Sequence, residues 1–175
     1  DILILKDGSM LISRFNKWEF LIAGYEDKKY TKILKKLVNS LNLNTLVSFV
    51  GPKLGKDKVE IFDNTDVFIL PTYNENYGIV VAEALARGIP VITTNGTPWE
   101  ELNTKDCGFY TDNTNEGIKE GLLKMLNKSE KDLQLMGTRG KKLIESKYLW
   151  KKNTKKTIEL YYWLLNGGHK PDFII

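Results

Sequence analysis

The sequence predicts an α/β fold, namely a Rossmann-like three-layer α/β/α domain with a mainly parallel sheet. Residues 66–94, DVFILPTYNENYGIVVAEALARGIPVITT, have the pattern of a strand, a loop, a helix, a turn and a second strand. Residues 67–70 are continuously apolar, as is typical of a strand covered on both faces. The helical segment 79–87 is followed by Gly88 and Pro90, which mark a helix end and a new strand. Two strands joined by one helix in this way run parallel.

The segments before this unit predict two more strands, at 18–23 and 47–50, and a short helix at 56–64. Residues 2–5 and 10–15 are further strand candidates on either side of Asp7-Gly8, a strong turn signal, so residues 2–5 and 10–14 could pair as a hairpin. Apolar residues recur at helical spacing in 27–41, at Tyr30, Ile33, Leu34, Leu37, Val38 and Leu41. The opposite face of this helix carries lysines 28, 29, 32, 35 and 36, which we interpret as a solvated face.

The segments after the unit predict a helical turn at 98–102, a short strand at 108–111 and a helix at 115–126. The inward side of that helix would hold Ile118, Leu122, Leu123 and Leu126. Ser129 is expected to cap a further helix that runs to about residue 147, with Asp132 placed as in a capping box. A last helix, 150–165, would place Thr157, Ile158, Tyr161, Tyr162 and Leu165 on one side. We therefore expect one domain over residues 1–166, with residues 1–17 atypical, and a tail over 167–175.

Length and composition fit one ordinary globular domain, since the chain has 175 residues, of which 42% are hydrophobic and 27% charged. The net charge of +4 is mild, and without a clustered basic stripe it does not indicate nucleic-acid binding. One cysteine, Cys107, excludes an internal disulfide framework and favours a reducing, cytoplasmic location. With one histidine and one cysteine there is no zinc constellation. No apolar run is long enough to span a membrane, and no signal peptide is visible.

The loop between the two central strands is the predicted ligand site, because ligands of parallel sheets bind at the carboxyl ends of strands. The loop, Tyr73 to Gly78, ends at the start of the helix, where unpaired backbone N–H groups can bind an anion. Gly78 would let a ligand approach the backbone. Glu75 lies in this loop and Glu83 lies in the helix. The two carboxylates could accept ligand hydroxyls, or they could be ordinary solvated side chains.

The order of short motifs along the chain resembles the retaining glycosyltransferases of the GT-B fold, a large family that includes sucrose synthase-like and capsule- or lipopolysaccharide-building enzymes. Glu75 and Glu83 match the signature of two glutamates separated by seven residues. The further matching segments are WEFLIAG at 18–24, VSFVG at 47–51, GIPVI at 88–92, GTPWEE at 96–101 and CGFY at 107–110. The resemblance spans nearly the whole chain and implies the C-terminal, donor-binding half of a GT-B fold.

The resemblance also implies roles for individual residues. Glu83 would hold the ribose hydroxyls of a nucleotide-sugar, and Glu75 would contact the donor sugar as the catalytic residue. The diphosphate would bind at the helix start, at Asn76, Tyr77, Gly78 and Ile79, and Gly51 would lie near the nucleotide base.

Near the N-terminus, Arg14 in Ser13-Arg14-Phe15 matches a family cation that neutralises the diphosphate. Lys17 is the nearest candidate for the second such cation. Glu19 stands at the position where the family has that lysine, so the chain departs from the family pattern there. The family's long helix after these residues is not evident in the sequence.

The function implied by the resemblance is transfer of a sugar from a nucleotide-sugar to a polysaccharide, lipid-linked or lipopolysaccharide-type acceptor, with retention. No cofactor or metal is expected, and an N-terminal domain would supply the acceptor site. The last helix would pack toward that domain; its basic start, with lysines 151, 152, 155 and 156, leaves a peripheral membrane contact as the other interpretation. A non-catalytic nucleotide-sugar binding module and a GT-B-type epimerase stay open. A nicotinamide-binding domain is disfavoured because the G-x-G-x-x-G turn is missing.

Overall fold

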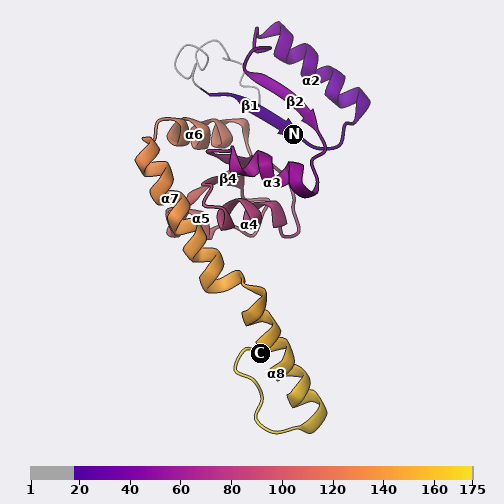
Figure 1. The fold of residues 1–175 in the computed structure, drawn as a ribbon, viewed down its shortest axis with the longest axis vertical. Coiled ribbons are helices and arrows are strands. Elements are labelled where there is room, and N and C mark those ends of the chain that lie inside the picture. Colours follow the sequence, from indigo (N-terminus) through magenta and orange to yellow (C-terminus); the bar gives the residue numbers. More distant parts are fainter. Residues whose placement is uncertain (1–17, 175) are drawn as a thin grey trace.

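The computed structural model describes residues 18–174, which form an α/β domain with one long helix projecting from it (Figure 1). The chain ends beside this helix, after a segment that turns back along it. The candidate hairpin of residues 2–5 and 10–15, together with Arg14 and Lys17, lies outside the described residues.

The helices and strands alternate through the first two thirds of the described chain, and helices make up the rest. In order, they are β1 Phe20–Ala23, α2 Lys28–Ser40, β2 Val47–Gly51, α3 Gly55–Asp63, β3 Phe68–Leu70, α4 Ile79–Ala86, β4 Val91–Thr94, α5 Glu101–Thr104, β5 Gly108–Thr111, α6 Asn115–Leu126, α7 Glu130–Leu143, the π-helix η1 Ile144–Tyr148 and α8 Trp150–Asn166. All the strands predicted after residue 17 are present, within two residues of their expected ends.

Every strand pairing among the described residues is parallel, which confirms the predicted direction. β1 pairs with β2, and β3, β4 and β5 pair in that order. Among residues 18–174 the predicted strands form two sheets, because no hydrogen bonds pair β1 or β2 with the other three strands. An apolar run predicts that a segment is a strand, but only the folded backbone decides which strand lies beside it.

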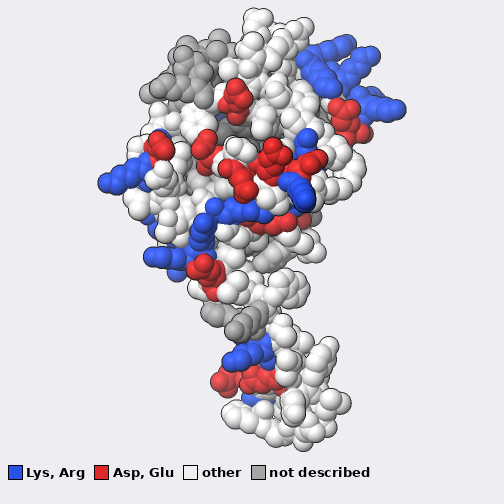
Figure 2. Space-filling view, in the orientation of Figure 1, with Lys and Arg blue, Asp and Glu red and all other residues white. Residues whose placement is uncertain are grey.

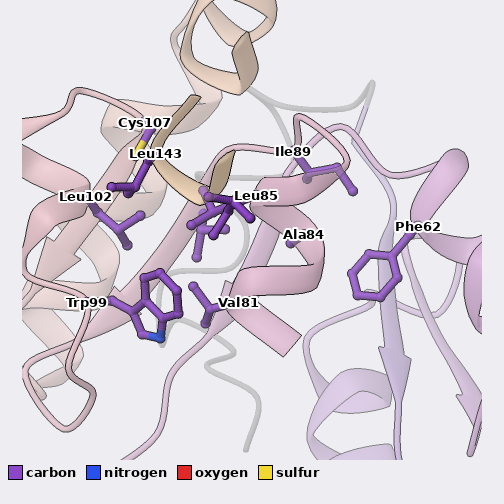
Figure 3. Close-up of a cluster of buried hydrophobic side chains, with 11 residues drawn as sticks. Phe62, Val81, Ala84, Leu85, Ile89, Trp99, Leu102, Cys107 and Leu143 are labelled. Atoms are coloured by element: carbon purple, nitrogen blue, oxygen red, sulfur yellow. The ribbon is translucent and has the colours of Figure 1, made fainter. Parts of the chain in front are cut away.

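β4 lies at the centre of three layers and is buried along its whole length. Val91 belongs to a cluster that includes Val81 and Leu85 of α4 and Trp99 (Figure 3). Its neighbour Ile92 belongs to a separate cluster formed with α6 and α7. Successive strand residues point to opposite faces of a sheet, so the sheet is covered on both sides, as predicted for the α/β/α fold.

α2 covers the smaller sheet with only part of its apolar side. Leu34 and Val38 are buried, whereas Tyr30, Ile33 and Leu37 are exposed. The lysines of this helix gather at one corner of the molecule (Figure 2) and are exposed, as expected of a solvated face.

The capping residues explain where several helices begin and end. Asp27 accepts a hydrogen bond from the backbone of Tyr30 at 2.8 Å, and Ser129 and Asp132 form the predicted capping box. Gly88 follows α4 with φ of +79°, the left-handed conformation expected after a helix end. The α7 segment becomes a π-helix at Ile144 instead of continuing as an α-helix.

Two predictions about the second half need correction. The helical turn expected at 98–102 begins only at Glu101 in the structure. In α6, Ile118 and Leu122 are buried as predicted, but Leu123 and Leu126 are only half-buried and Met125 takes the inner position.

The side of α8 that was predicted to be apolar is largely exposed in this chain, so its packing toward another domain stays a prediction. Ile158, Tyr161, Tyr162 and Leu165 are 53%, 60%, 69% and 83% exposed. The segment after Gly167 is not a free tail, because Pro171 is buried and the Lys156 ammonium lies 5.5 Å from the centre of the Phe173 ring. No helix in the described part of the chain has the length and apolarity that crossing a membrane requires.

Candidate functional site

The loop between β3 and α4 is tied to the turn after β4 by backbone and hydroxyl groups. The Thr94 hydroxyl donates to the carbonyl of Thr72, and the backbone N–H of Glu75 donates to the carbonyl of Gly96 at 2.8 Å. The buried Thr93 hydroxyl donates to the carbonyl of Leu70 at 2.9 Å. Because β4 is the most deeply buried strand, these bonds hold the loop on a rigid support.

The N-terminus of α4 presents backbone N–H groups that have no acceptor within residues 18–174. Gly78 caps the helix with φ of +69° and ψ of +57°, and no side chain caps the helix start. No described residue accepts a hydrogen bond from the N–H of Tyr77, Gly78 or Ile79. Gly78 is buried, and an unpaired backbone N–H in such a place costs free energy. An anionic ligand would satisfy these donors.

Glu75 lies against the start of this helix. A Cβ placed on Gly78 would be 3.3 Å from the Cγ of Glu75 and 3.4 Å from the indole nitrogen of Trp99. The glutamate side chain is therefore folded over Gly78, half-buried, next to the free N–H groups. A larger residue at 78 would have both a strained backbone and a tight contact.

Glu83 lies on the second turn of α4 and faces α3. Its Oε2 is 2.5 Å from the ammonium of Lys58, and the two side chains are 38% and 33% exposed. Oε2 is sealed from solvent and has no well-aligned hydrogen bond among the described residues. The contact with Lys58 is thus an ion pair without hydrogen-bond geometry, and it occupies one oxygen of the carboxylate.

A cluster of three aromatic side chains packs against the loop between β3 and α4. The rings of Tyr77, Trp99 and Tyr148 lie 5.1–6.3 Å apart between centroids. The Trp99 indole N–H donates to the carbonyl of Tyr77 at 2.6 Å. Tyr148 comes from the π-helix, so the cluster joins the loop to the segment just before α8.

An acidic group anchors this cluster. Glu101 accepts hydrogen bonds from Lys147 at 2.8 Å and from the Tyr148 hydroxyl at 2.6 Å. These bonds lower the pKa of Glu101 below its ordinary value. Burial and the bond to Glu101 raise the pKa of Tyr148 to about 12. Burial also raises the pKa of Tyr77. Both tyrosines therefore act as neutral hydroxyls near neutral pH.

The structure brings part of the predicted set of residues together. Glu75, Asn76, Tyr77, Gly78 and Ile79 form one loop and helix start, with Asn76 and Ile79 exposed. Glu83 lies on the same helix, on the side that faces α3.

Gly51, at the end of β2, has φ of +66° and precedes the loop that leads into α3. This loop is joined to the predicted site through Lys58 of α3, which contacts Glu83. Arg14 and Lys17 lie outside the described residues, so their predicted roles stay predictions.

The sequence interpretation missed two residues that shape the site. Trp99 holds the loop backbone, and an aromatic residue in a Gly- and Pro-containing turn after a buried strand was a signal that could have singled it out. Lys58 gave no such signal, because its pairing with Glu83 depends on the packing of α3 against α4. No group of three or more metal-ligating side chains occurs in residues 18–174. Cys107 is buried, which raises the pKa of its thiol to about 11.

The fold and the loop together define a parallel α/β domain with an open helix start after β3, and comparison with known proteins identifies its family. The family model described as "Glycosyl transferases group 1" matches residues 4–143. The chain belongs to this family. It is 28% identical over 152 residues to a sucrose synthase from Melioribacter roseus, a match that covers 81% of this chain and 19% of that protein.

Solved structures share the fold at lower identity. The C-terminal domain of LpcC, a glycosyl transferase group 1 family protein from Francisella tularensis, matches with a TM-score of 0.69 at 20% identity, over 81% of this chain and 75% of that chain. Anabaena HepE in complex with UDP-glucose matches with a TM-score of 0.69 at 17% identity, over 89% of this chain and 45% of HepE. These matches confirm the predicted GT-B-type fold.

Proposed function

We propose that this chain is the donor-binding part of a glycosyltransferase that transfers a sugar from a nucleotide-sugar with retention. The observation that carries the proposal is the unpaired helix start at Gly78, with Glu75 folded over it and Glu83 one turn further along α4. Family membership supports it, as does the binding of UDP-glucose by the similarly folded HepE.

Each part of the proposed site binds a different part of the donor. The N–H groups of Tyr77, Gly78 and Ile79 take the diphosphate, which also benefits from the helix dipole. Glu83 accepts hydrogen bonds from the ribose hydroxyls through the oxygen that Lys58 does not occupy. Glu75 contacts the donor sugar. Hydrogen bonds to an ionised carboxylate are stronger than neutral ones, which suits both glutamates to hydroxyl recognition.

The transfer step leaves negative charge on the departing diphosphate. Backbone N–H groups that already point at this position stabilise the charge without reorganisation. Arg14 and Lys17 are the proposed cations for the same group. The proposal includes no metal ion, because the sequence has no paired-aspartate motif.

The acceptor site belongs, in this proposal, to an N-terminal domain. The chain spans 45% of HepE, and the exposed apolar side chains of α8 offer a surface against which such a domain can pack. Closure of two domains would exclude water and complete the site. The proposed acceptor is a glycan or a lipid-linked sugar, and the proposed location is cytoplasmic, with a peripheral membrane contact if the acceptor is lipid-linked.

The test is a calorimetric titration of the chain with UDP-, GDP-, ADP- and CDP-sugars and with the bare nucleoside diphosphates. Glu83→Gln should weaken the binding of both the bare nucleotide and the full donor by about 10- to 100-fold, because one charge-assisted hydrogen bond is lost. Glu75→Gln should leave the affinity for the bare nucleotide unchanged and weaken only the binding of the sugar-bearing donor. Glu159→Gln, an exposed glutamate on α8, is the matched control and should change neither.

Three outcomes would contradict parts of the proposal. If the wild-type chain binds no nucleoside diphosphate, the donor-site assignment is wrong. If both variants weaken the bare nucleotide equally, the division of roles between the glutamates is wrong. If the chain joined to its N-terminal domain binds the donor but transfers no sugar, the non-catalytic or epimerase alternative replaces the transferase.

A further inference from the structure

Trp99 is the buried side chain that contacts the backbone at the proposed diphosphate site. It is 1% exposed, and its indole ring packs beside Val81 at the start of α4 (Figure 3). Its only polar atom, the indole nitrogen, donates to the carbonyl oxygen of Tyr77 at 2.6 Å. A buried tryptophan whose N–H is used on a loop carbonyl contributes orientation as well as packing.

This hydrogen bond fixes a peptide plane. The carbonyl of Tyr77 and the N–H of Gly78 belong to the same peptide unit, which is trans. In a trans peptide these two groups point in opposite directions. Because Trp99 holds the carbonyl, the N–H of Gly78 points away from the indole. A flipped peptide would instead turn a carbonyl oxygen toward a bound anion and repel it.

Two neighbouring features also favour this orientation of the Tyr77–Gly78 peptide. Gly78 has a left-handed backbone conformation, which lets the chain turn from the held carbonyl directly into α4. The carbonyl of Gly78 is itself used, accepting a hydrogen bond from the N–H of Val81 at 2.8 Å. Both carbonyls next to the site are therefore occupied, and the N–H of Gly78 has no acceptor among residues 18–174.

We propose that Trp99 is a positioning residue of the donor site, whose indole N–H orients the Tyr77–Gly78 peptide so that its N–H group faces the donor's diphosphate. This proposal rests on the proposed donor-binding function. It assigns Trp99 to the phosphate part of the donor and to neither the ribose nor the base. A purely structural tryptophan would need only its ring, which phenylalanine largely replaces.

The experiment compares Trp99→Phe with Trp150→Phe in the 175-residue chain. Both variants lose one indole N–H, but Trp150 is 85% exposed. UDP and uridine are titrated into each protein, and thermal unfolding is recorded alongside. If the wild-type chain prefers another base, the matching diphosphate and nucleoside replace them. We expect Trp99→Phe to weaken the binding of UDP by about 2- to 15-fold, as for the loss of one hydrogen bond, and to leave the affinity for uridine unchanged.

The outcomes separate this proposal from the one on which it depends. No binding of any nucleoside diphosphate by the wild-type chain overturns the donor site itself. Binding of UDP by the wild type with unchanged affinity in Trp99→Phe overturns the positioning role alone. Equal weakening of UDP and uridine overturns it too, because the effect is then not confined to the phosphates.

A second measurement covers the case in which Trp99→Phe does not fold. On titration of the ¹⁵N-labelled wild-type chain with UDP, the amide resonance of Gly78 should shift strongly while the Trp99 indole N–H stays protected from exchange. Uridine should leave the Gly78 amide unmoved. An unmoved Gly78 amide with saturating UDP would overturn the proposal.

Discussion

The two halves of the domain differ in how tightly they are packed. Among the described residues, the half built on β1 and β2 buries few side chains: Leu34, Val38 and Leu43 are 8%, 3% and 8% exposed. The half built on β3, β4 and β5 has fully buried residues in every layer, including Val81, Val91, Leu102, Cys107 and Met125, each at 0% exposure. The helix start proposed to bind the diphosphate, at Tyr77, Gly78 and Ile79, lies on the second, tightly packed half.

This difference shows why the site combines a rigid and an adaptable part. The loop before α4 is held by threonine hydroxyls and by Trp99, all supported by buried β4 and its neighbours. Glu83 instead contacts Lys58 of α3, the helix that connects β2 to β3 between the two halves, in a half-exposed ion pair. The part of the site proposed to bind phosphate is thus held by the core of the second half. The position of Glu83, proposed to bind the ribose, depends instead on the packing of α3 against α4.

The largest predicted effect comes from a substitution that disrupts the packing of the second half. A Cβ on Gly137 of α7 would collide with the carbonyl group of Gly88, whose carbon would be 2.7 Å away. Gly137→Ala should therefore destabilise the chain by about 1–3 kcal/mol or more, measured by urea unfolding, because both partners are backbone and cannot rotate aside. Gly24→Ala is the control in the first half, where an added Cβ meets nothing within 4 Å. Equal effects would show that the two halves do not differ in packing tolerance.

The next prediction concerns the junction between the halves. Lys58→Met removes the charge that holds Glu83, so the carboxylate can rotate away from the ribose position. The nucleoside diphosphate should bind more weakly by about two- to fivefold, as for loss of less than 1 kcal/mol in a half-exposed ion pair. Lys58→Arg should restore binding, and Lys56→Met, an exposed lysine of the same helix, should have no effect. Tighter binding by Lys58→Met would show that Lys58 competes with the ribose instead of positioning Glu83.

A smaller effect, dependent on pH, is expected at the acidic anchor behind the loop. Tyr148→Phe removes one of the hydrogen bonds that lower the pKa of Glu101. A carboxyl group whose pKa is lower in the folded protein than in the unfolded chain stabilises the fold at pH values above its unfolded-state pKa. This contribution is lost as the pH falls through its folded-state pKa.

The variant should therefore be less stable by about 1 kcal/mol at pH 7, and the difference should shrink below the ordinary pKa of 4.5. Urea unfolding at pH 7 and pH 3.5 measures both values, with the exposed Tyr162→Phe as control. A difference that stays constant across this range would contradict the role of Glu101.

The smallest effect is expected on the projecting helix. Leu165 is 83% exposed, so Leu165→Ala should change the free energy of unfolding of this chain by no more than about 0.5 kcal/mol. Leu143→Ala, at a leucine that is 4% exposed next to α4, should destabilise the chain clearly more, because removing a buried side chain leaves a cavity. If Leu165→Ala proves costly here, α8 packs within this chain more extensively than its exposure indicates.

The sequence by itself determined most of the secondary structure and the position of the loop before α4. Continuous apolar runs bounded by glycine and proline predicted β3 and β4, and helical spacing predicted α2 and α6, because these signals depend on neighbours in the chain. Gly78, Glu75 and Glu83 were likewise found from their places at the start and on the second turn of one helix.

Only the tertiary structure decided the sheet arrangement, the support of the loop and the exposure of α8. Strand order depends on hydrogen bonds between distant segments, and the Trp99–Tyr77 and Lys58–Glu83 contacts join residues 22 and 25 positions apart. Amphipathic spacing in α8 predicted an apolar side but not what covers it, because a helix pattern carries no information about its partner. Local chain chemistry therefore sets which elements form, and packing sets which side chains meet.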